Sequence, residues 1–200
     1  MSAQESHPTL SVVMPVYNGL RYLRKSLPPL LANRDEKLLE VLVVDDGSTD
    51  GSGDFARECG ARVISSGGHV GPAGARNVAV RVARGQIVLF VDADVVVHPD
   101  TVGRVIRAFP DPETVAVFGS YDGTPADRGF SSQYMNLRHH YIHQQPSDDA
   151  QTFWAGLGAT RRDAFLAVGG FDAERYATPT IEDIDLGRRL QDAGGQIRRL

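Results

Sequence analysis

Residues 41–50 read VLVVDDGSTD, and residues 87–94 read IVLFVDAD. In both stretches a short run of β-branched and other apolar residues ends in a pair of aspartates. A continuous apolar run bounded by polar or turn residues is typical of a strand that is buried on both faces of a parallel sheet. We therefore predict strands at 39–44 and 87–91, each with acidic residues at its carboxyl end.

Similar runs occur elsewhere in the first half, and amphipathic segments separate them. Further strands are predicted at 10–16, 62–65 and 115–119, and helices at 20–31, at 72–83 and after Pro99. This alternation predicts an α/β fold with a mostly parallel, Rossmann-like sheet flanked by helices. Asn18 is the expected cap of the first helix, and Pro28 and Pro29 are expected to break or kink it.

The second half of the sequence is less regular. Helices are predicted at 131–144, 161–168 and 181–193, an apolar stretch at 153–159, and an extended segment at 196–200. The Gly-, Pro- and Asp-containing segment 122–129 is predicted to be a loop rather than a domain linker. A chain of 200 residues suffices for one domain with a substantial core and is too short for two ordinary ones. We expect one domain, and a longer parent protein, since the last extended segment is cut short.

Composition limits the class of protein and partner. Apolar residues make up 42% and charged residues 23%, as in ordinary globular chains. A formal net charge of −4 gives no general attraction to a phosphate backbone, so nucleic acid is not an expected partner. The single Cys59 fits a reducing compartment, and neither a signal peptide nor a membrane span is predicted. The expected location is cytoplasmic.

The acidic strand ends point to a cation. Ligands of open α/β sheets bind beyond the carboxyl ends of the strands, where Asp45, Asp46, Asp92 and Asp94 are expected to meet. Four carboxylates in one crevice repel one another, and Mn²⁺ or Mg²⁺ would relieve that repulsion. Residues 45–50 could instead form only an Asx turn and a helix cap. A receiver-type phosphoacceptor domain also carries paired acids, but on its first strand, whereas here a strand and a helix come before them.

Six motifs, in this order and spacing, resemble those of the family 2 inverting glycosyltransferases of the GT-A fold. They are 12–19 (VVMPVYNG), 43–50 (VVDDGSTD), 71–77 (GPAGARN), 91–94 (VDAD), 168–172 (VGGFD) and 181–186 (IEDIDL). The likeness covers the chain from 10 to 196. It implies one GT-A-type domain, with about 10–120 as the nucleotide-sugar-binding half and about 121–200 as the acceptor and catalytic-base half, truncated at the C-terminus.

The resemblance also assigns roles to single residues. The donor-binding residues it implies are Pro15, Val16, Tyr17, Asp46, Arg76 and Asp92. Asp46 would accept a hydrogen bond from a base N–H, and Arg76 would lie near the nucleotide. Asp94, together with Asp92, would hold the Mn²⁺ or Mg²⁺ that joins the two phosphates.

Asp183 is the implied catalytic base. A carboxylate within hydrogen-bond reach of the acceptor hydroxyl can take its proton. The alternative is structural, because Thr180 followed by Asp183 matches a helix capping pattern. Trp154, Gly156 and Glu182 are placed on the acceptor side, although Trp154 could equally fill the core.

The sequence therefore predicts metal-dependent, inverting transfer of a sugar from a nucleotide-diphosphate sugar to a hydroxyl. UDP-sugars are the commonest donors in the family, and the acceptor would be a saccharide, a lipid-linked molecule or another hydroxyl compound. Peripheral association with the inner face of the membrane would suit a lipid-linked acceptor. The alternative is a nucleotide-sugar-binding domain without turnover: the intact Asp183 argues against it, and the expected missing C-terminal segment argues for it. A nucleotidyltransferase is disfavoured, because no Gly-rich loop follows 10–16.

Overall fold

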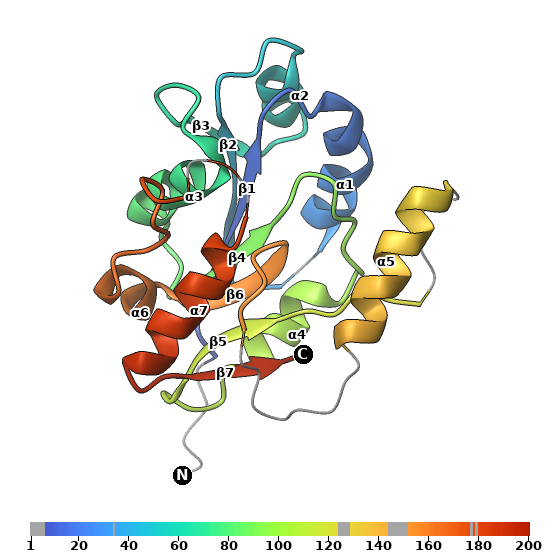
Figure 1. Ribbon diagram of the computed structural model, residues 1–200. Helices are drawn as coiled ribbons and strands as arrows, with labels where there is room; N and C mark the ends of the chain where they lie inside the picture. The colour runs from blue at the N-terminus through green and yellow to red at the C-terminus, as the bar shows by residue number, and fades with distance from the viewer. Residues whose placement is uncertain (1–6, 34, 124–128, 144–151, 177, 179) are drawn as a thin grey trace.

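A computed structural model describes residues 7–33, 35–123, 129–143, 152–176, 178 and 180–200 (Figure 1). Its centre is a seven-stranded sheet with the order β3-β2-β1-β4-β6-β5-β7. The strands are β1 (Leu10–Val16), β2 (Leu38–Asp45), β3 (Arg62–Ser65), β4 (Ile87–Val91), β5 (Thr114–Phe118), β6 (Leu157–Arg161) and β7 (Gln196–Arg199). All neighbours pair in parallel except β6, which is antiparallel to both β4 and β5. The predicted mostly parallel α/β sheet is confirmed.

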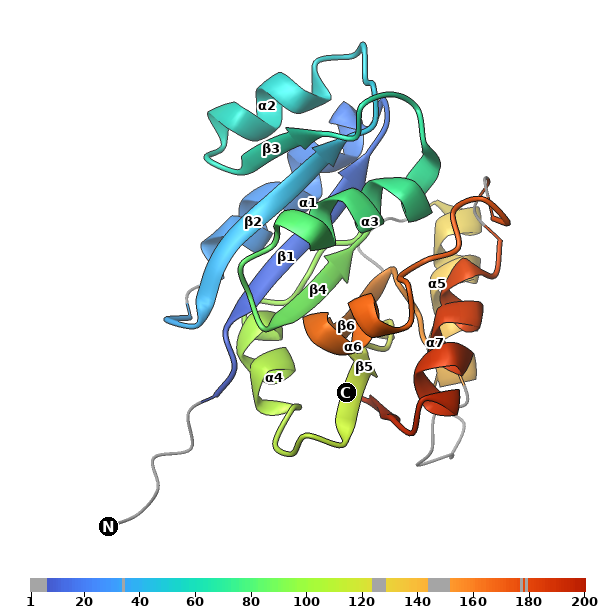
Figure 2. The same cartoon turned by 90° about the vertical axis from the view of Figure 1, so that its left-hand side faces the viewer.

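Helices cover both faces of the sheet (Figures 1 and 2). They are α1 (Leu20–Ala32), α2 (Ser52–Glu58), α3 (Gly71–Val82), α4 (Thr101–Arg107), α5 (Phe130–His143), α6 (Arg162–Ala167) and α7 (Glu182–Asp192). Buried residues of α1, α2 and α4 form one core with Val12 and Met14, and those of α3, α6 and α7 form the other with Val13. The strands are thus apolar on both faces, which explains their unbroken apolar runs. Among the described residues, no helix is both long and apolar enough to cross a bilayer.

The strand order places a crevice at one edge of the sheet. From β1 the chain moves outward through β2 and β3, and then returns to place β4 on the other side of β1. Such a reversal of strand order leaves a crevice beyond the carboxyl ends of the strands. Because Val16 pairs with Asp45, and Val13 with Phe90, the residues that follow β1, β2 and β4 emerge at this same edge.

The start of α1 differs from the prediction. Asn18 does not cap the helix: it has a φ of 47°, and its Oδ1 accepts from the backbone N–H of Thr49 at 2.8 Å. The carboxylate of Asp50 accepts instead from the N–H of Leu20 at 2.9 Å, and from that of Ser52 at 3.0 Å. The sequence pattern missed this cap because it comes from a residue distant along the chain.

Pro28 and Pro29 do not break α1, since the helix continues to Ala32; a kink at the two prolines stays a prediction. The two prolines deprive the carbonyls of Arg24 and Lys25 of their helical N–H partners. Both of those residues are exposed. Water can therefore satisfy the two carbonyls, while the opposite face of the helix stays packed in the core.

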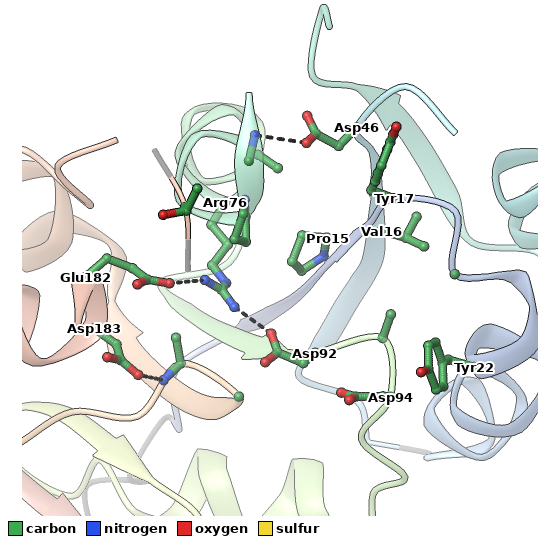
Figure 3. A pocket seen from close by; sticks show the side chains of 18 of the residues that line it. Pro15, Val16, Tyr17, Tyr22, Asp46, Arg76, Asp92, Asp94, Glu182 and Asp183 are labelled. Atoms are coloured by element: carbon green, nitrogen blue, oxygen red, sulfur yellow. Dashed lines mark hydrogen bonds and ion pairs between the residues drawn. The ribbon is translucent and has the colours of Figure 1, made fainter. Parts of the chain in front are cut away.

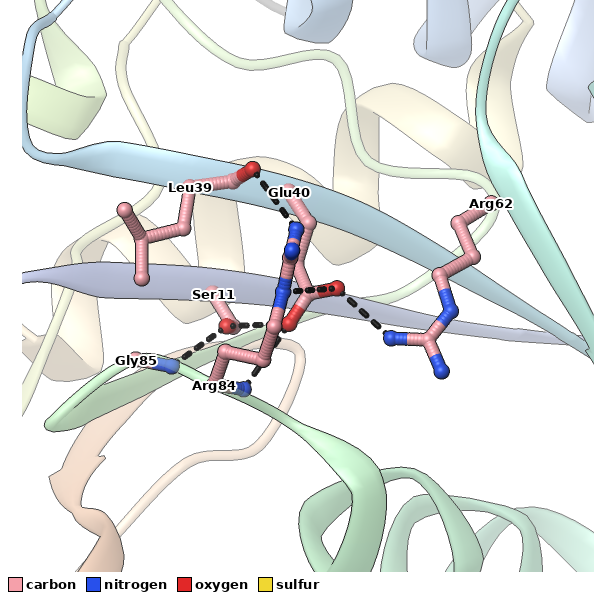
Figure 4. Close-up of polar contacts among 6 residues, drawn as sticks. All are labelled: Ser11, Leu39, Glu40, Arg62, Arg84 and Gly85. Carbon is pink, nitrogen blue, oxygen red and sulfur yellow. Dashed lines mark hydrogen bonds and ion pairs between the residues drawn. The ribbon is translucent and has the colours of Figure 1, made fainter.

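A buried carboxylate ties together the end of the sheet that lies away from the crevice (Figure 4). The Glu40 side chain is 4% exposed. It accepts from the Ser11 hydroxyl at 3.0 Å, from Arg62 Nη1 at 2.8 Å, and from the backbone N–H and Nε of Arg84 at 2.8 and 3.2 Å. Burial alone would raise the pKa of Glu40, but these hydrogen bonds and the Arg84 charge lower it. Glu40 thereby links β2 to β1, to β3 and to the segment before β4.

Candidate active site

A pocket of about 670 Å³ opens at the carboxyl ends of β1, β2 and β4 (Figure 3). Ten of the eleven residues assigned to a site from the sequence line it: Pro15, Val16, Tyr17, Asp46, Arg76, Asp92, Asp94, Gly156, Glu182 and Asp183. Further lining residues, which the sequence did not indicate, include Tyr22, His69, Ala155 and Thr178. The fold thus brings together residues from five of the six motifs.

The two aspartates at the end of β2 have different roles. Asp45 is not among the residues that line the pocket; its Oδ1 accepts from the N–H of Ser48 at 2.8 Å, which is an Asx turn. Asp46 lines the pocket, is 3% exposed, and accepts from the N–H groups of Val70 and Gly71, both at 2.9 Å. The prediction of four carboxylates in one crevice was therefore wrong for Asp45, which the backbone turn holds away from it.

An aromatic pair stands beside Asp46. Tyr17 is 51% exposed. The centroid of its ring lies 4.1 Å from that of the His69 ring, and the two ring planes make an angle of 34°. His69 Nδ1 lies 3.1 Å from Oδ2 of Asp46. Nothing in the sequence singled out His69, because a lone histidine in a Gly-rich loop matches no pattern. Only the return of that loop to β2 brings it to the pocket.

Arg76 joins two parts of the site that are far apart in the sequence (Figure 3). It is 4% exposed; its Nη2 donates to Oδ1 of Asp92 at 2.5 Å, and its Nη1 lies 3.6 Å from Oε1 of Glu182. Its Nε and Nη1 have no hydrogen-bond partner among the described residues. Glu182 in turn accepts from the N–H of Thr180 at 2.8 Å. Glu182, assigned to the acceptor side from the sequence, is thus a partner of Arg76, and the pair connects the end of β4 with the start of α7.

Asp92 and Asp94 follow β4 and face the pocket. Burial, and then the negative charge of Asp92, raise the pKa of Asp94. The backbone N–H of Asp92 donates to the carbonyl of Gly156 at 3.0 Å, and a Cβ at position 156 would lie 3.4 Å from Oδ2 of Asp92. A glycine there leaves room beside the carboxylate.

The donor set suits a hard divalent cation. Mg²⁺ and Mn²⁺ prefer oxygen ligands and are usually held by one or two carboxylates together with substrate phosphates. Within the described part of the chain, no three His, Cys, Asp or Glu side chains are grouped to hold a metal by themselves. Two neighbouring carboxylates, Asp92 and Asp94, therefore fit a metal whose remaining ligands come from a bound phosphate compound.

Asp183 lies on the opposite wall of the pocket (Figure 3). Its Oδ2 accepts from the N–H of Ala155 at 3.3 Å, and its Oδ1 from that of Ile184 at 2.9 Å. Burial first, and then the nearby charge of Glu182, raise the pKa of Asp183. The predicted capping pattern is not formed, since α7 has Ile181 at its N-cap without a side-chain hydrogen bond. A carboxylate with a raised pKa is better able to accept a proton.

Trp154 is the one residue of the predicted set that is not among the residues lining this pocket. Its Nε1 donates to Thr152 Oγ1 at 3.0 Å, and its ring meets that of His139, on α5, edge to face at 5.6 Å. The residues that follow it, Ala155 and Gly156, do reach the pocket. The acceptor-side role of Trp154 stays a prediction.

Comparisons with known proteins agree on one family. Residues 11–169 match the family model described as "Glycosyl transferase family 2". A pre-mycofactocin glycosyltransferase of Mycobacterium tuberculosis is 28% identical over 202 residues, covering 96% of this chain and 41% of that protein. Glycosyltransferase GlyG of Streptococcus pneumoniae serotype 4 is 30% identical over 117 residues, covering 56% of this chain and 38% of that protein. The chain thus spans less than half the length of these two relatives.

Solved glycosyltransferase structures have a similar fold. The mannosyltransferase PcManGT of Pyrobaculum calidifontis, in complex with GDP-Man and Mn²⁺, has a TM-score of 0.77 and 25% sequence identity, covering 98% of this chain and 55% of that one. GalNAc-T7 with UDP, GalNAc and Mn²⁺ has a TM-score of 0.75 at 17% identity, covering 98% and 43%. The second likeness concerns the fold alone.

Proposed function

This chain belongs to glycosyl transferase family 2 and has the GT-A fold, and we propose that it transfers a sugar from a nucleotide-diphosphate donor to an acceptor hydroxyl. The observation that carries the proposal is the single pocket that holds both the aspartates after β4 and Asp183. Leaving-group stabilisation and proton removal must occur at one reacting centre, so their groups must share a cavity. The similar mannosyltransferase, solved with GDP-Man and Mn²⁺, supports both the donor class and the metal.

The proposed donor lies across three neighbouring strands. Asp46 follows β2, Tyr17 follows β1, and Asp92 follows β4. Two strand spacings amount to about 10 Å, which lets one nucleotide place its base at the β2 end and its diphosphate at the β4 end. Asp94 and Asp92 would hold Mn²⁺ or Mg²⁺, which would neutralise the departing diphosphate. A UDP-sugar is the proposed donor, and GDP- and dTDP-sugars are the alternatives to test.

In the proposed reaction Asp183 takes the proton of the acceptor hydroxyl. The hydroxyl oxygen forms a bond to the anomeric carbon on the face opposite the diphosphate. The bond from that carbon to the phosphate oxygen breaks, and the diphosphate leaves with the bonding electrons. This single displacement inverts the anomeric centre, so an α-linked donor gives a β-linked product.

The acceptor is the least defined part of the proposal. We place it beside Asp183, on the wall formed by Ala155 and Gly156. This fits a division into a nucleotide-sugar-binding half, about 10–120, and an acceptor half, about 121–200, which stays a prediction. The proposed acceptor is a saccharide, a lipid-linked molecule or another hydroxyl compound. If the acceptor is lipid-linked, we expect the protein to associate with the membrane surface.

Calorimetry with UDP, GDP and dTDP, with and without Mn²⁺, tests donor binding directly. We expect tight binding of at least one nucleotide with the metal and much weaker binding after chelation, because the metal offsets the charge of phosphates and carboxylates. Release of nucleoside diphosphate from the matching sugar donor then tests turnover. Binding without release would indicate a nucleotide-sugar-binding domain, and failure of all nucleotides to bind would refute the proposal.

A further inference from the structure

The turn that carries Asp92 and Asp94 is held from behind by α1. The two aspartates follow β4, and the backbone N–H of Val95 donates to the carbonyl of Asp92 at 2.9 Å. This hydrogen bond closes a β-turn, in which Ala93 and Asp94 are the two central residues. The hydroxyl of Ser26, on α1, donates to the carbonyl of Ala93 at 2.6 Å. Ser26 is 0% exposed and is not among the residues that line the pocket, so a bound ligand cannot touch it.

Two carbonyls compete for the single proton of the Ser26 hydroxyl. That of Tyr22, one turn earlier in α1, lies 3.2 Å away, and that of Ala93 lies 2.6 Å away. The Tyr22 carbonyl is also the helical acceptor for the backbone N–H of Ser26. Within the described residues, no other group donates to the carbonyl of Ala93. Because the shorter distance is typical of a well-formed O–H···O bond, the proton is directed to Ala93.

The Ala93 carbonyl belongs to the central peptide of the turn, and the orientation of that peptide distinguishes the common turn types. Turning it over converts a type I turn into type II and moves φ of the third residue from about −90° to about +80°. Asp94 is that third residue, and its φ is negative, because Asn18 is the one described non-glycine residue with a positive φ. Aspartate tolerates a positive φ better than most residues do, so its identity does not prevent the flip. The hydrogen bond from Ser26 opposes it, since a flipped carbonyl points away from α1.

The carboxylate of Asp94 depends on this turn more than that of Asp92 does. Nη2 of Arg76 donates to Oδ1 of Asp92 at 2.5 Å, which holds the Asp92 side chain directly. In the part of the chain that the structure describes, the Asp94 carboxylate accepts only from its own backbone N–H. Asp94 nevertheless lines the pocket beside Asp92 (Figure 3). The direction of its side chain therefore follows from the orientation of its backbone.

We propose that Ser26 is a positioning residue for Asp94: its hydroxyl holds the turn in the orientation that directs Asp94, together with Asp92, toward one divalent cation. This inference rests on the proposed function, in which these aspartates hold Mn²⁺ or Mg²⁺. Removing a group that orients metal ligands without touching the metal typically lowers metal affinity roughly 10- to 100-fold. Helix formation itself does not require this serine, because alanine is the better helix former.

Calorimetry of nucleotide binding, with Mn²⁺ and with a chelator, tests this role. The measured quantity is the ratio of the two affinities for the nucleoside diphosphate that binds the intact chain best. Ser26→Ala should reduce this ratio roughly 10- to 100-fold by weakening binding with Mn²⁺, while binding with chelator stays nearly unchanged. A melting curve checks that the variant folds. Ser26→Thr keeps the hydroxyl, and when folded it should retain most of the ratio.

Ser11→Ala is the matched control (Figure 4). Ser11 is also 0% exposed, and its hydroxyl donates to Glu40 at 3.0 Å, at the end of the sheet away from the crevice. Its replacement likewise removes one buried hydrogen bond, but the ratio should stay that of the intact chain.

The possible outcomes separate this inference from the proposed function. An unchanged ratio in folded Ser26→Ala, or an equal fall in Ser11→Ala, would overturn the inference alone. Nucleotide binding by the intact chain that does not need Mn²⁺ would overturn the inference together with the proposed metal. If no nucleotide binds the intact chain, the proposed function itself fails.

Discussion

Asp183→Asn separates a catalytic from a structural role. Asparagine has the same size and keeps an oxygen that can accept from the N–H of Ile184, but it cannot act as a base at neutral pH. The substitution puts at risk one long hydrogen bond, from the N–H of Ala155 at 3.3 Å, which is worth at most about 1 kcal/mol. If Asp183 is the base, turnover should fall by about two to four orders of magnitude.

The two effects differ enough in size to be told apart. Loss of two to four decades of rate corresponds to about 2.7–5.5 kcal/mol in the activation barrier. That exceeds any change in stability expected from the hydrogen bonds of Asp183. The assay combines nucleoside diphosphate release, donor binding by calorimetry and a melting curve, and donor affinity should stay close to that of the intact chain.

The raised pKa of Asp183 adds a pH signature. Because the base must be ionised, activity should rise with pH through a value above that of an ordinary aspartate and then level off. The folded chain holds this proton more tightly than the unfolded chain, so the stability from Asp183 falls as pH rises across the same interval. At pH values above that interval, the melting temperature of the Asp183→Asn protein should therefore be no lower than that of the intact chain.

Asp185→Asn is the control on the same helix. Asp185 pairs with Arg189 at 2.7 Å and is not among the residues that line the pocket, so its replacement should leave turnover nearly unchanged. Normal turnover in a folded, donor-binding Asp183→Asn protein would remove Asp183 from the mechanism. Activity that falls as pH rises through the acidic range would refute the assigned protonation state.

Three further substitutions test other parts of the chain. Asp94→Asn should weaken Mn²⁺-assisted binding of the nucleotide roughly tenfold or more by calorimetry, yet melt no lower without metal, because burial and the charge of Asp92 disfavour the ionised carboxyl. Glu40→Gln should lower the free energy of unfolding, measured in urea, by about 2–4 kcal/mol. This loss of stability should become smaller as pH falls below the ordinary glutamate range, where Glu40 itself is protonated. Glu36→Gln, at an exposed position, should leave the free energy of unfolding almost unchanged. Asp50→Ala should cost about 1–2 kcal/mol through loss of its contacts at the start of α1, and exposed Asp54→Ala under about 0.5 kcal/mol. Equal losses in either pair would contradict the reasoning.

Local pattern was sufficient for most of the fold. The five strands predicted in the first part of the chain lie within about one residue of β1 to β5, because buried parallel strands leave continuous apolar runs. The short helix α2 and the antiparallel direction of β6 were not predicted. Neither has a signature of its own: α2 follows turn residues, and strand direction depends on pairing partners distant in the sequence.

In the site, too, local sequence pattern predicted part of the structure, and contacts between distant segments determine the rest. Motifs indicated ten of the residues that line the pocket, but not how those residues pair with one another. The Arg76–Glu182 contact, the retention of Asp45 in a turn, and the approach of His69 to Asp46 all depend on loops brought together by the fold. Of these, only the Asx turn had been considered as an alternative.

The antiparallel strand β6 has a consequence for how such chains diversify. The chain leaves the sheet after Phe118 of β5 and rejoins it at Leu157 of β6, and Phe118 pairs directly with Gly158. The connection between them thus starts and finishes on adjacent strands, about 5 Å apart. Lengthening or exchanging a connection with fixed, close ends costs little in loop entropy, which grows only with the logarithm of its length. The part of this connection before Phe153 can therefore change in length or sequence without disturbing the strands that carry Asp46 and Asp92. Its last residues are fixed, because Phe153 is buried against Phe90, and Ala155 and Gly156 hydrogen-bond to Asp183 and Asp92.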